Sequence, residues 1–139
     1  MSKSRTSWLV ALVPFVLLLA ACAPAARPVA ATLPVFYAAE PLDVMGVVIL
    51  AISTAPGLDD SNGWVIAQSD TQGGYVRAET DVTTPRWFLR RESTRTESVT
   101  VVVSAAGPNR TQVVVQRTSG AESLSQHITR ELQARFGLN

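Results

Sequence analysis

Four short segments rich in β-branched residues, separated by turn residues, occupy the middle of this 139-residue chain. These segments are residues 64–67, 75–82, 98–104 and 111–118. Residues 70–74 and 107–109 between them carry the glycine, asparagine and proline typical of tight turns. In the second segment apolar and small residues alternate with Tyr75, Arg77, Glu79 and Asp81. The pattern predicts an antiparallel meander of four strands with one buried face and one wet face.

Apolar residues at helical spacing flank these strands on both sides. After Pro41, a residue suited to the first turn of a helix, a stripe repeats at spacings of three and four: Leu42, Met45, Ile49 and Ile52. It predicts a helix from about 40 to 54, although residues 47–49 also suit a buried strand. A second stripe, four residues apart, predicts a helix ending at Gly137: Leu124, Ile128, Leu132 and Phe136.

The predicted order of elements is therefore α-β-β-β-β-α. One helix stripe and one sheet face need each other for burial, so the economical arrangement is an α+β fold. It is expected to be a four-stranded antiparallel meander with two helices packed on one face. Arg77, Glu79 and Asp81 then face water on the other side of the sheet.

The N-terminal segment has the features of an export signal. Lys3 and Arg5 precede an apolar run, residues 8–19, that is too short to span a membrane, and small residues come just before the single cysteine, Cys22. Residues 19–22 resemble the lipobox of bacterial lipoproteins, which implies cleavage after Ala21 and acylation of the cysteine. A buried apolar residue in an uncleaved segment and a reactive thiol are the alternatives for Cys22. The coincidence of charge, run length and small residues favours the lipid anchor.

This assignment divides the chain into three parts: a signal peptide (1–21), a lipidated cysteine with an Ala/Pro-rich tether (22–38), and one α+β domain (39–139). Within the tether, residues 35–37 are expected to dock on the domain. The expected partner is a lipid bilayer, reached through acylated Cys22. Residue 23 is alanine, which under the enteric sorting rule favours the outer membrane, but the choice between cell membrane and outer membrane stays open. Loss of Lys3 and Arg5 lowers the net charge from +1 to about −1, which argues against general binding to nucleic acid.

The stretch 62–80 has the order Gly-Trp, apolar strand, Ser-Asp, glycine turn and Ala-Glu strand end. Together with the flanking helices, it resembles small single-module envelope lipoproteins and, more distantly, one domain of BamC-type lipoproteins. The resemblance covers about residues 40–136. It implies a helix-grip-like fold and a scaffolding role with an envelope protein as a candidate partner. The chain is shorter than BamC-type proteins, which have two such modules, so the resemblance does not extend to barrel assembly.

No motif of catalysis or metal binding stands out. The loop 57–63 contains Asp59 and Asp60 but lacks the further oxygen ligands of a calcium loop. His127, the single histidine, is followed four residues later by Glu131, and an imidazole–carboxylate contact fits that spacing. No nucleophile elbow accompanies it. We therefore expect no catalytic residue, no metal site and no cofactor.

The most unusual local feature alternates arginines with large apolar residues. It comprises Arg86, Trp87, Phe88, Arg90, Arg91 and Arg95. Such a stretch favours contact with a protein partner or an anionic membrane surface. The alternative is a long connection in which Trp87 and Leu89 cap the core while the arginines stay in water.

Three classes of function remain. The first, a structural or protein-interaction module of the cell envelope, follows from the predicted anchor, the tether and the absence of a catalytic motif. The second is binding of a small ligand or lipid in a groove between sheet and helices. The third, an enzyme using Asp59, Asp60 and His127, ranks last because the predicted topology does not bring these residues together.

Overall fold

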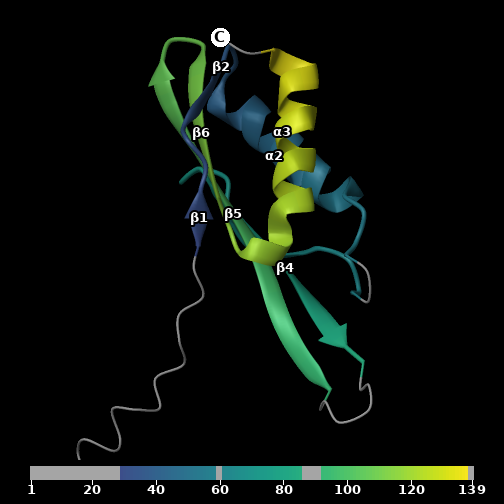
Figure 1. Ribbon diagram of the computed structural model, residues 1–139. Coiled ribbons are helices and arrows are strands. Elements are labelled where there is room, and N and C mark those ends of the chain that lie inside the picture. Colours follow the sequence, from purple (N-terminus) through teal and green to yellow (C-terminus); the bar gives the residue numbers. More distant parts are fainter. Residues whose placement is uncertain (1–28, 59–60, 86–91, 138–139) are drawn as a thin grey trace, which may run out of the picture.

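An antiparallel sheet forms one layer of the molecule and two helices cover one of its faces (Figure 1). The computed structural model describes residues 29–58, 61–85 and 92–137. The strands are β1 (Ala30–Ala31), β2 (Val35–Tyr37), β3 (Val65–Asp70), β4 (Tyr75–Thr84), β5 (Ser93–Gly107) and β6 (Arg110–Arg117). They lie in the order β1-β6-β5-β4-β3, and β2 also pairs with β6. The predicted meander is confirmed as β3 to β6, with every pair antiparallel.

The turn between β3 and β4 lies where the sequence predicts it. The Asp70 carboxylate accepts hydrogen bonds from the backbone N–H groups of Gln72 (3.1 Å) and Gly73 (2.8 Å). Gly74 has a φ of 69°, and its carbonyl accepts a hydrogen bond from the N–H of Val103 (2.7 Å). A Cβ at Gly74 would lie 1.9 Å from the Val103 carbonyl oxygen. Glycine is therefore required both by the backbone angle and by the close approach of β5.

The sheet begins inside the segment that the sequence indicates as a tether. β1 and β2 pair with the outer edge of β6. Thr32 follows β1 and exchanges hydrogen bonds with Val115. Phe36 lies under the Arg110 guanidinium, 4.4 Å from ring centre to Cζ, a distance suited to a cation–π contact. Residues 35–37 thus dock on the domain, as expected, and β1 and β2 together widen the four-stranded meander to a six-stranded sheet.

Both predicted helices are confirmed: α2 (Pro41–Thr54) and α3 (Glu122–Phe136), the latter preceded by the short 3₁₀ helix η2 (Ser119–Ala121). α2 carries the chain from β2 at one side of the sheet to β3 at the opposite edge. α3 ends at Phe136 and is followed by Gly137, whose φ is 68°. In the described part of the chain, neither helix has the length and apolar character needed to cross a bilayer.

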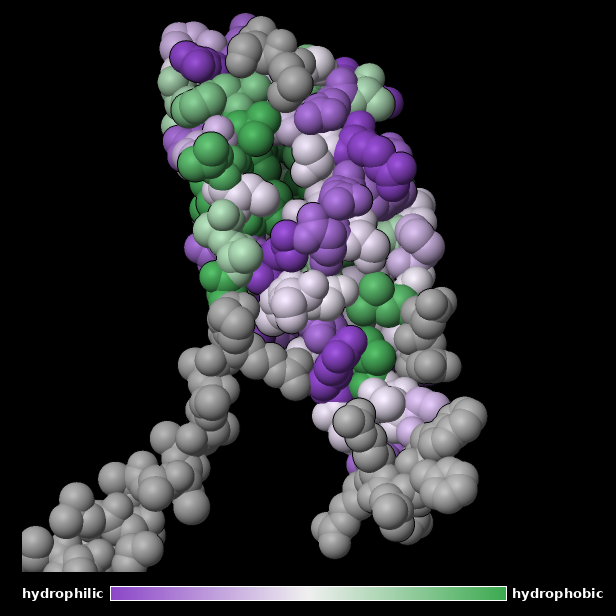
Figure 2. All heavy atoms as spheres, in the orientation of Figure 1, coloured by the Kyte–Doolittle hydropathy of each residue, from purple (hydrophilic) through white to green (hydrophobic). Residues whose placement is uncertain are grey.

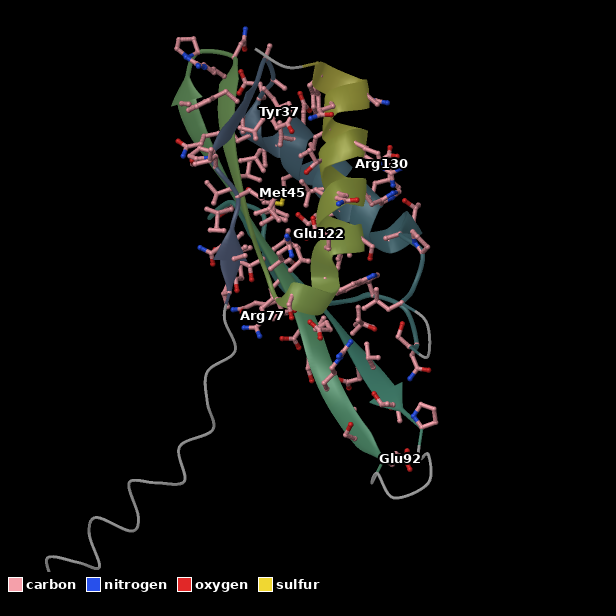
Figure 3. All side chains as sticks on the ribbon, viewed as in Figure 1. Tyr37, Met45, Arg77, Glu92, Glu122 and Arg130 are labelled. Atoms are coloured by element: carbon pink, nitrogen blue, oxygen red, sulfur yellow. The ribbon has the colours of Figure 1, made fainter. Side chains whose placement is uncertain are left out.

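The core lies between the inner sheet face and the two helices, and Figure 3 shows Tyr37 and Met45 within it. Burial raises the pKa of Tyr37 above its usual value of 10.0. The sheet contributes Val76, Ala78, Val99, Val101, Val103, Val113 and Val115. α3 contributes the predicted residues Leu124, Ile128 and Leu132. The fold is thus α+β and helix-grip-like, with a hydrophilic band over the outward side of α3 (Figure 2).

The face that α2 turns to the core differs from the predicted stripe. Met45 and Ile52 are buried as expected, but Leu42 is 67% exposed and Ile49 only half-buried. Val44 and Val48 occupy the core instead. α2 is apolar on nearly all sides, so spacing alone selects no single face. This rotation leaves apolar side chains on the outside of α2.

Candidate functional site

The residues predicted to contact a partner fall mainly outside the part of the chain that the structure describes. These are Cys22 and the stretch 86–91, which contains Arg86, Trp87, Phe88, Arg90 and Arg91. Asp59 and Asp60, considered as calcium ligands or as catalytic groups, also lie outside the described residues. Arg95 is described. It lies on β5 with its side chain half exposed, and its Nε is 3.1 Å from a carboxylate oxygen of Glu97.

Glu97 is a buried carboxylate on the inner face of the sheet, 2% exposed. Its Oε2 accepts hydrogen bonds from the Thr118 hydroxyl (2.5 Å) and from the backbone N–H of Gly120 (3.0 Å). Each hydrogen bond compensates part of the cost of burying the charge. A Cβ at Gly120 would lie 2.4 Å from the Glu97 carboxyl carbon. Glu97 therefore fastens the start of η2 to β5, and glycine makes this close approach possible.

His127 lies on α3 and is half-buried. Its Nε2 is buried and has no hydrogen-bond partner among the residues that the structure describes. Within the same residues no hydrogen bond or ion pair joins it to Glu131, and the contact that their spacing suggests is not formed. Glu131 instead lines a surface groove.

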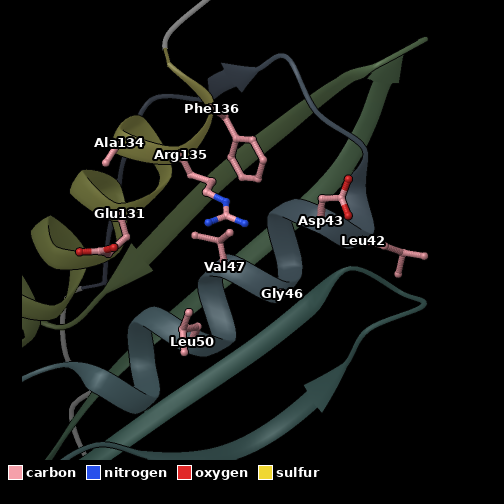
Figure 4. A pocket seen from close by; sticks show the side chains of 9 residues that line it. All are labelled: Leu42, Asp43, Gly46, Val47, Leu50, Glu131, Ala134, Arg135 and Phe136. Atoms are coloured by element: carbon pink, nitrogen blue, oxygen red, sulfur yellow. The ribbon is translucent and has the colours of Figure 1, made fainter.

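That groove runs between α2 and α3 and has a volume of about 750 Å³. Figure 4 shows its two walls. The α2 wall consists of Leu42, Asp43, Gly46, Val47 and Leu50, and the α3 wall of Glu131, Ala134, Arg135 and Phe136. Leu42 and Leu50 are 67% and 61% exposed. Large apolar side chains exposed together on one helix commonly mark a binding surface.

Gly46 lies at the middle of this exposed stripe, one turn from Leu42 and one turn from Leu50. An added Cβ would meet nothing within 4 Å. Glycine inside a helix costs roughly 1 kcal/mol relative to alanine, and no packing contact in the described molecule calls for it here. Its effect is to leave the α2 backbone bare at the floor of the groove.

Three charged groups line the groove. Arg135 extends from α3 over Val47 toward the α2 wall, whereas the Glu131 carboxylate points away from it (Figure 4). Glu131 is four residues before Arg135, a spacing that favours an intrahelical ion pair. In the described part of the chain, no salt bridge or hydrogen bond joins Arg135 to Glu131 or Asp43. The guanidinium is therefore available to a ligand.

A second hollow, of about 430 Å³, adjoins the first at Leu42. It lies between the start of α2, the β3–β4 turn at residues 71–74, and β5 at residues 103–105. Leu42 lines both hollows, so apolar surface continues around the N-terminal turn of α2. Sequence periodicity assigns Leu42 to the core, which is why the sequence does not predict this surface.

A third hollow, of about 340 Å³, lies over β3 and β4 and includes Asn62, Glu79, Asp81 and Thr96. Asp81 accepts a hydrogen bond from the Thr96 hydroxyl (2.7 Å), and Glu79 pairs with Arg77 (2.6 Å). Across the described ranges, no three His, Cys, Asp or Glu residues come together in a way that would hold a metal ion. The α2–α3 groove is larger than either of the other two hollows.

No protein-family model matches the chain, and no curated protein matches it. Among solved structures it is similar to TTHA0849 from Thermus thermophilus, with a TM-score of 0.39 and 13% identity over 77% of this chain and 98% of that one. It is also similar to the Zhui aromatase/cyclase from a Streptomyces species, with a TM-score of 0.34 and 13% identity over 79% and 86% of the two chains. These structures are not of the BamC type. The expected resemblance to small envelope lipoproteins and BamC-type domains is therefore wrong.

Proposed function

We propose that the chain is a small binding module that takes a ligand with an apolar chain in the groove between α2 and α3. The observation that carries this proposal is the exposed stripe of α2, which faces a groove of about 750 Å³ rather than another element. Sites for small molecules have volumes of roughly 300–1,000 Å³ and mostly apolar walls with a few polar groups. The proposal includes no catalytic step.

Burial of the exposed stripe supplies the driving force. Complete burial of a leucine side chain contributes about 1.5–3 kcal/mol, and Leu42 and Leu50 are both more than half exposed in the free molecule. Phe136 and Val47 are partly buried and give the groove further apolar wall. A ligand chain along α2 would cover all four side chains.

The proposed site differs from the groove between sheet and helices that the sequence suggested. Between those layers, the side chains of both are packed into one core. The exposed apolar surface lies instead on the outward side of the helix layer. A ligand can therefore enter without separating the helices from the sheet.

We combine this proposal with the predicted lipid anchor at Cys22, which would hold the binding module at a membrane. A module held at a membrane surface by acyl chains would meet amphipathic ligands there at high local concentration. Cys22 lies outside the described residues, and the anchor remains a prediction from the sequence.

Binding is tested with the purified full chain and the neutral apolar probe N-phenyl-1-naphthylamine, whose fluorescence rises in an apolar site. We expect saturable binding to the wild-type chain. Leu42→Ser and Leu50→Ser together should weaken it about tenfold or more, since two partly buried leucine contacts are lost. Leu33→Ser is a matched control because Leu33 is 86% exposed and does not line the groove.

Absence of saturable binding by the wild-type chain would refute the proposed function. Equal losses in the Leu42/Leu50 and Leu33 variants would place the probe elsewhere. Both variants replace exposed side chains, so their thermal unfolding should stay close to that of the wild type and separates lost binding from lost folding.

A further inference from the structure

The groove brings charged groups from both helices next to apolar side chains of α2. Asp43 lies in the first turn of α2 and Arg135 in the last turn of α3. Both line the groove, Asp43 next to Leu42 on α2 and Arg135 next to Phe136 on α3 (Figure 4). The Arg135 guanidinium lies over Val47, and Leu50 follows further along α2. Glu131 also lines the α3 wall, with its carboxylate pointing away from Arg135 (Figure 4). The groove therefore offers a ligand both charged groups and apolar surface.

Asp43 and Arg135 form no ion pair inside the described part of the molecule. No salt bridge or hydrogen bond joins Asp43 to Arg135, and neither group has such a partner elsewhere in the part of the chain that the structure describes. Arg135 also turns away from Glu131, its natural partner one helical turn earlier (Figure 4). Among the described residues, a free cation and a free anion thus face the same space from opposite walls.

From this arrangement we infer that the ligand is a zwitterionic single-chain lipid, with its phosphate at Arg135, its ammonium group at Asp43 and its acyl chain along Val47 and Leu50. The inference rests on the proposed function. Charge complementarity is what selects this class. A simple anion would pair with Arg135 but be repelled by Asp43, and a simple cation would be repelled by Arg135. A headgroup with both charges satisfies both walls.

Gly46 fits the same geometry. It lies one turn after Leu42, between Asp43 and Leu50, and its missing side chain leaves room beside the α2 backbone. The junction of headgroup and acyl chain would lie beside this glycine.

The test compares three lipids with the same acyl chain, each below its micelle concentration, as competitors of the neutral probe. They are lysophosphatidylethanolamine (zwitterionic), lysophosphatidic acid (anionic) and monoacylglycerol (neutral). The zwitterionic lipid should displace the probe at the lowest concentration. Arg135→Gln should weaken both phosphate-containing lipids about fivefold, the scale of a solvent-exposed ion pair, and leave monoacylglycerol unchanged. Asp43→Asn should weaken only the zwitterionic lipid and strengthen the anionic one.

Arg130→Gln is the matched control, because Arg130 is exposed on the same helix (Figure 3) and does not line the groove. Equal affinities of the wild-type chain for all three lipids, with probe binding intact, would overturn the headgroup inference and leave the proposed function standing. A preference for the anionic lipid would do the same. Loss of the probe site through self-association, seen by sedimentation, would assign the groove to a second copy and overturn both.

Discussion

At the scale of single residues, Glu97 shows how a charged side chain comes to lie in an apolar layer. Val99, Val101 and Val103 alternate on β5 and face the core, and Glu97 has the same parity. The alternation therefore places its carboxylate on the inner face, where it accepts hydrogen bonds from the Thr118 hydroxyl and the Gly120 N–H. The sequence shows that Glu97 alternates in step with the core valines. It does not show which groups bind the Glu97 carboxylate, because they lie about 20 residues further along the chain.

Glu97→Ala should destabilise the fold by about 1–3 kcal/mol, because the Gly120 N–H and the Thr118 hydroxyl lose a buried acceptor. Urea unfolding of the full chain measures the change. Glu79→Ala is the control: Glu79 lies on the neighbouring strand and pairs with Arg77, but both side chains are about one third or more exposed. Its loss should cost well under 1 kcal/mol. Equal losses in the two variants would contradict the structural role assigned to Glu97.

At the scale of elements, the sequence predicts the β3–β4 turn and the apolar stripe of α3. It does not predict which face of α2 is buried, nor the short strands β1 and β2. The β3–β4 turn follows from Asp70 and Gly74, whose local chemistry is sufficient to define it. The α3 stripe follows from four apolar residues among polar ones. α2 has too few polar residues to mark its exposed face, so the spacing places Leu42 on the wrong side of the helix. β1 and β2 contain two and three residues, too few for alternation to appear.

Substitutions at Gly46 separate the stability of the folded chain from ligand binding in the groove. Gly46→Ala should raise the free energy of unfolding by about 0.5–1 kcal/mol, because helix propensity improves and the new Cβ meets nothing within 4 Å. Thermal unfolding measures this. Gly46→Leu should fold equally well but fill the groove and reduce probe binding. A less stable alanine variant would mean that the folded chain itself needs glycine here, and unchanged probe binding by the leucine variant would place the ligand elsewhere.

At the scale of the whole molecule, the helix-grip-like fold was predictable and the candidate site was not. The fold depends on patterns repeated over many residues, such as the valines of β5 and β6. The site depends on how far α2 is rotated about its axis and on where Arg135 points. Both are set by packing against the sheet and by the crossing of two helices, which no local pattern records.

The predicted lipid anchor is also tested on the whole chain. In a bacterial host fed labelled palmitate, the wild-type chain should carry the label and partition into detergent. Cys22→Ser should carry none and remain unprocessed, because it removes the single thiol of the chain. Ala25→Ser, three residues later, is the control and should behave like the wild type. Label that persists on the serine variant, or a mature chain starting at another residue, would show that the lipobox assignment is wrong.

The pairing of β1 and β2 with β6 has a mechanical consequence. The chain is hydrogen-bonded to the sheet at Ala30–Thr32 and again at Val35–Tyr37 before it enters α2. The buried Tyr37 and the hydrogen bond from Thr111 to the Ala39 carbonyl (2.6 Å) secure the last residues before the helix. A pull on the chain ahead of Val29 is therefore borne by these strand pairs in turn. The walls of the groove would keep their spacing under such a load.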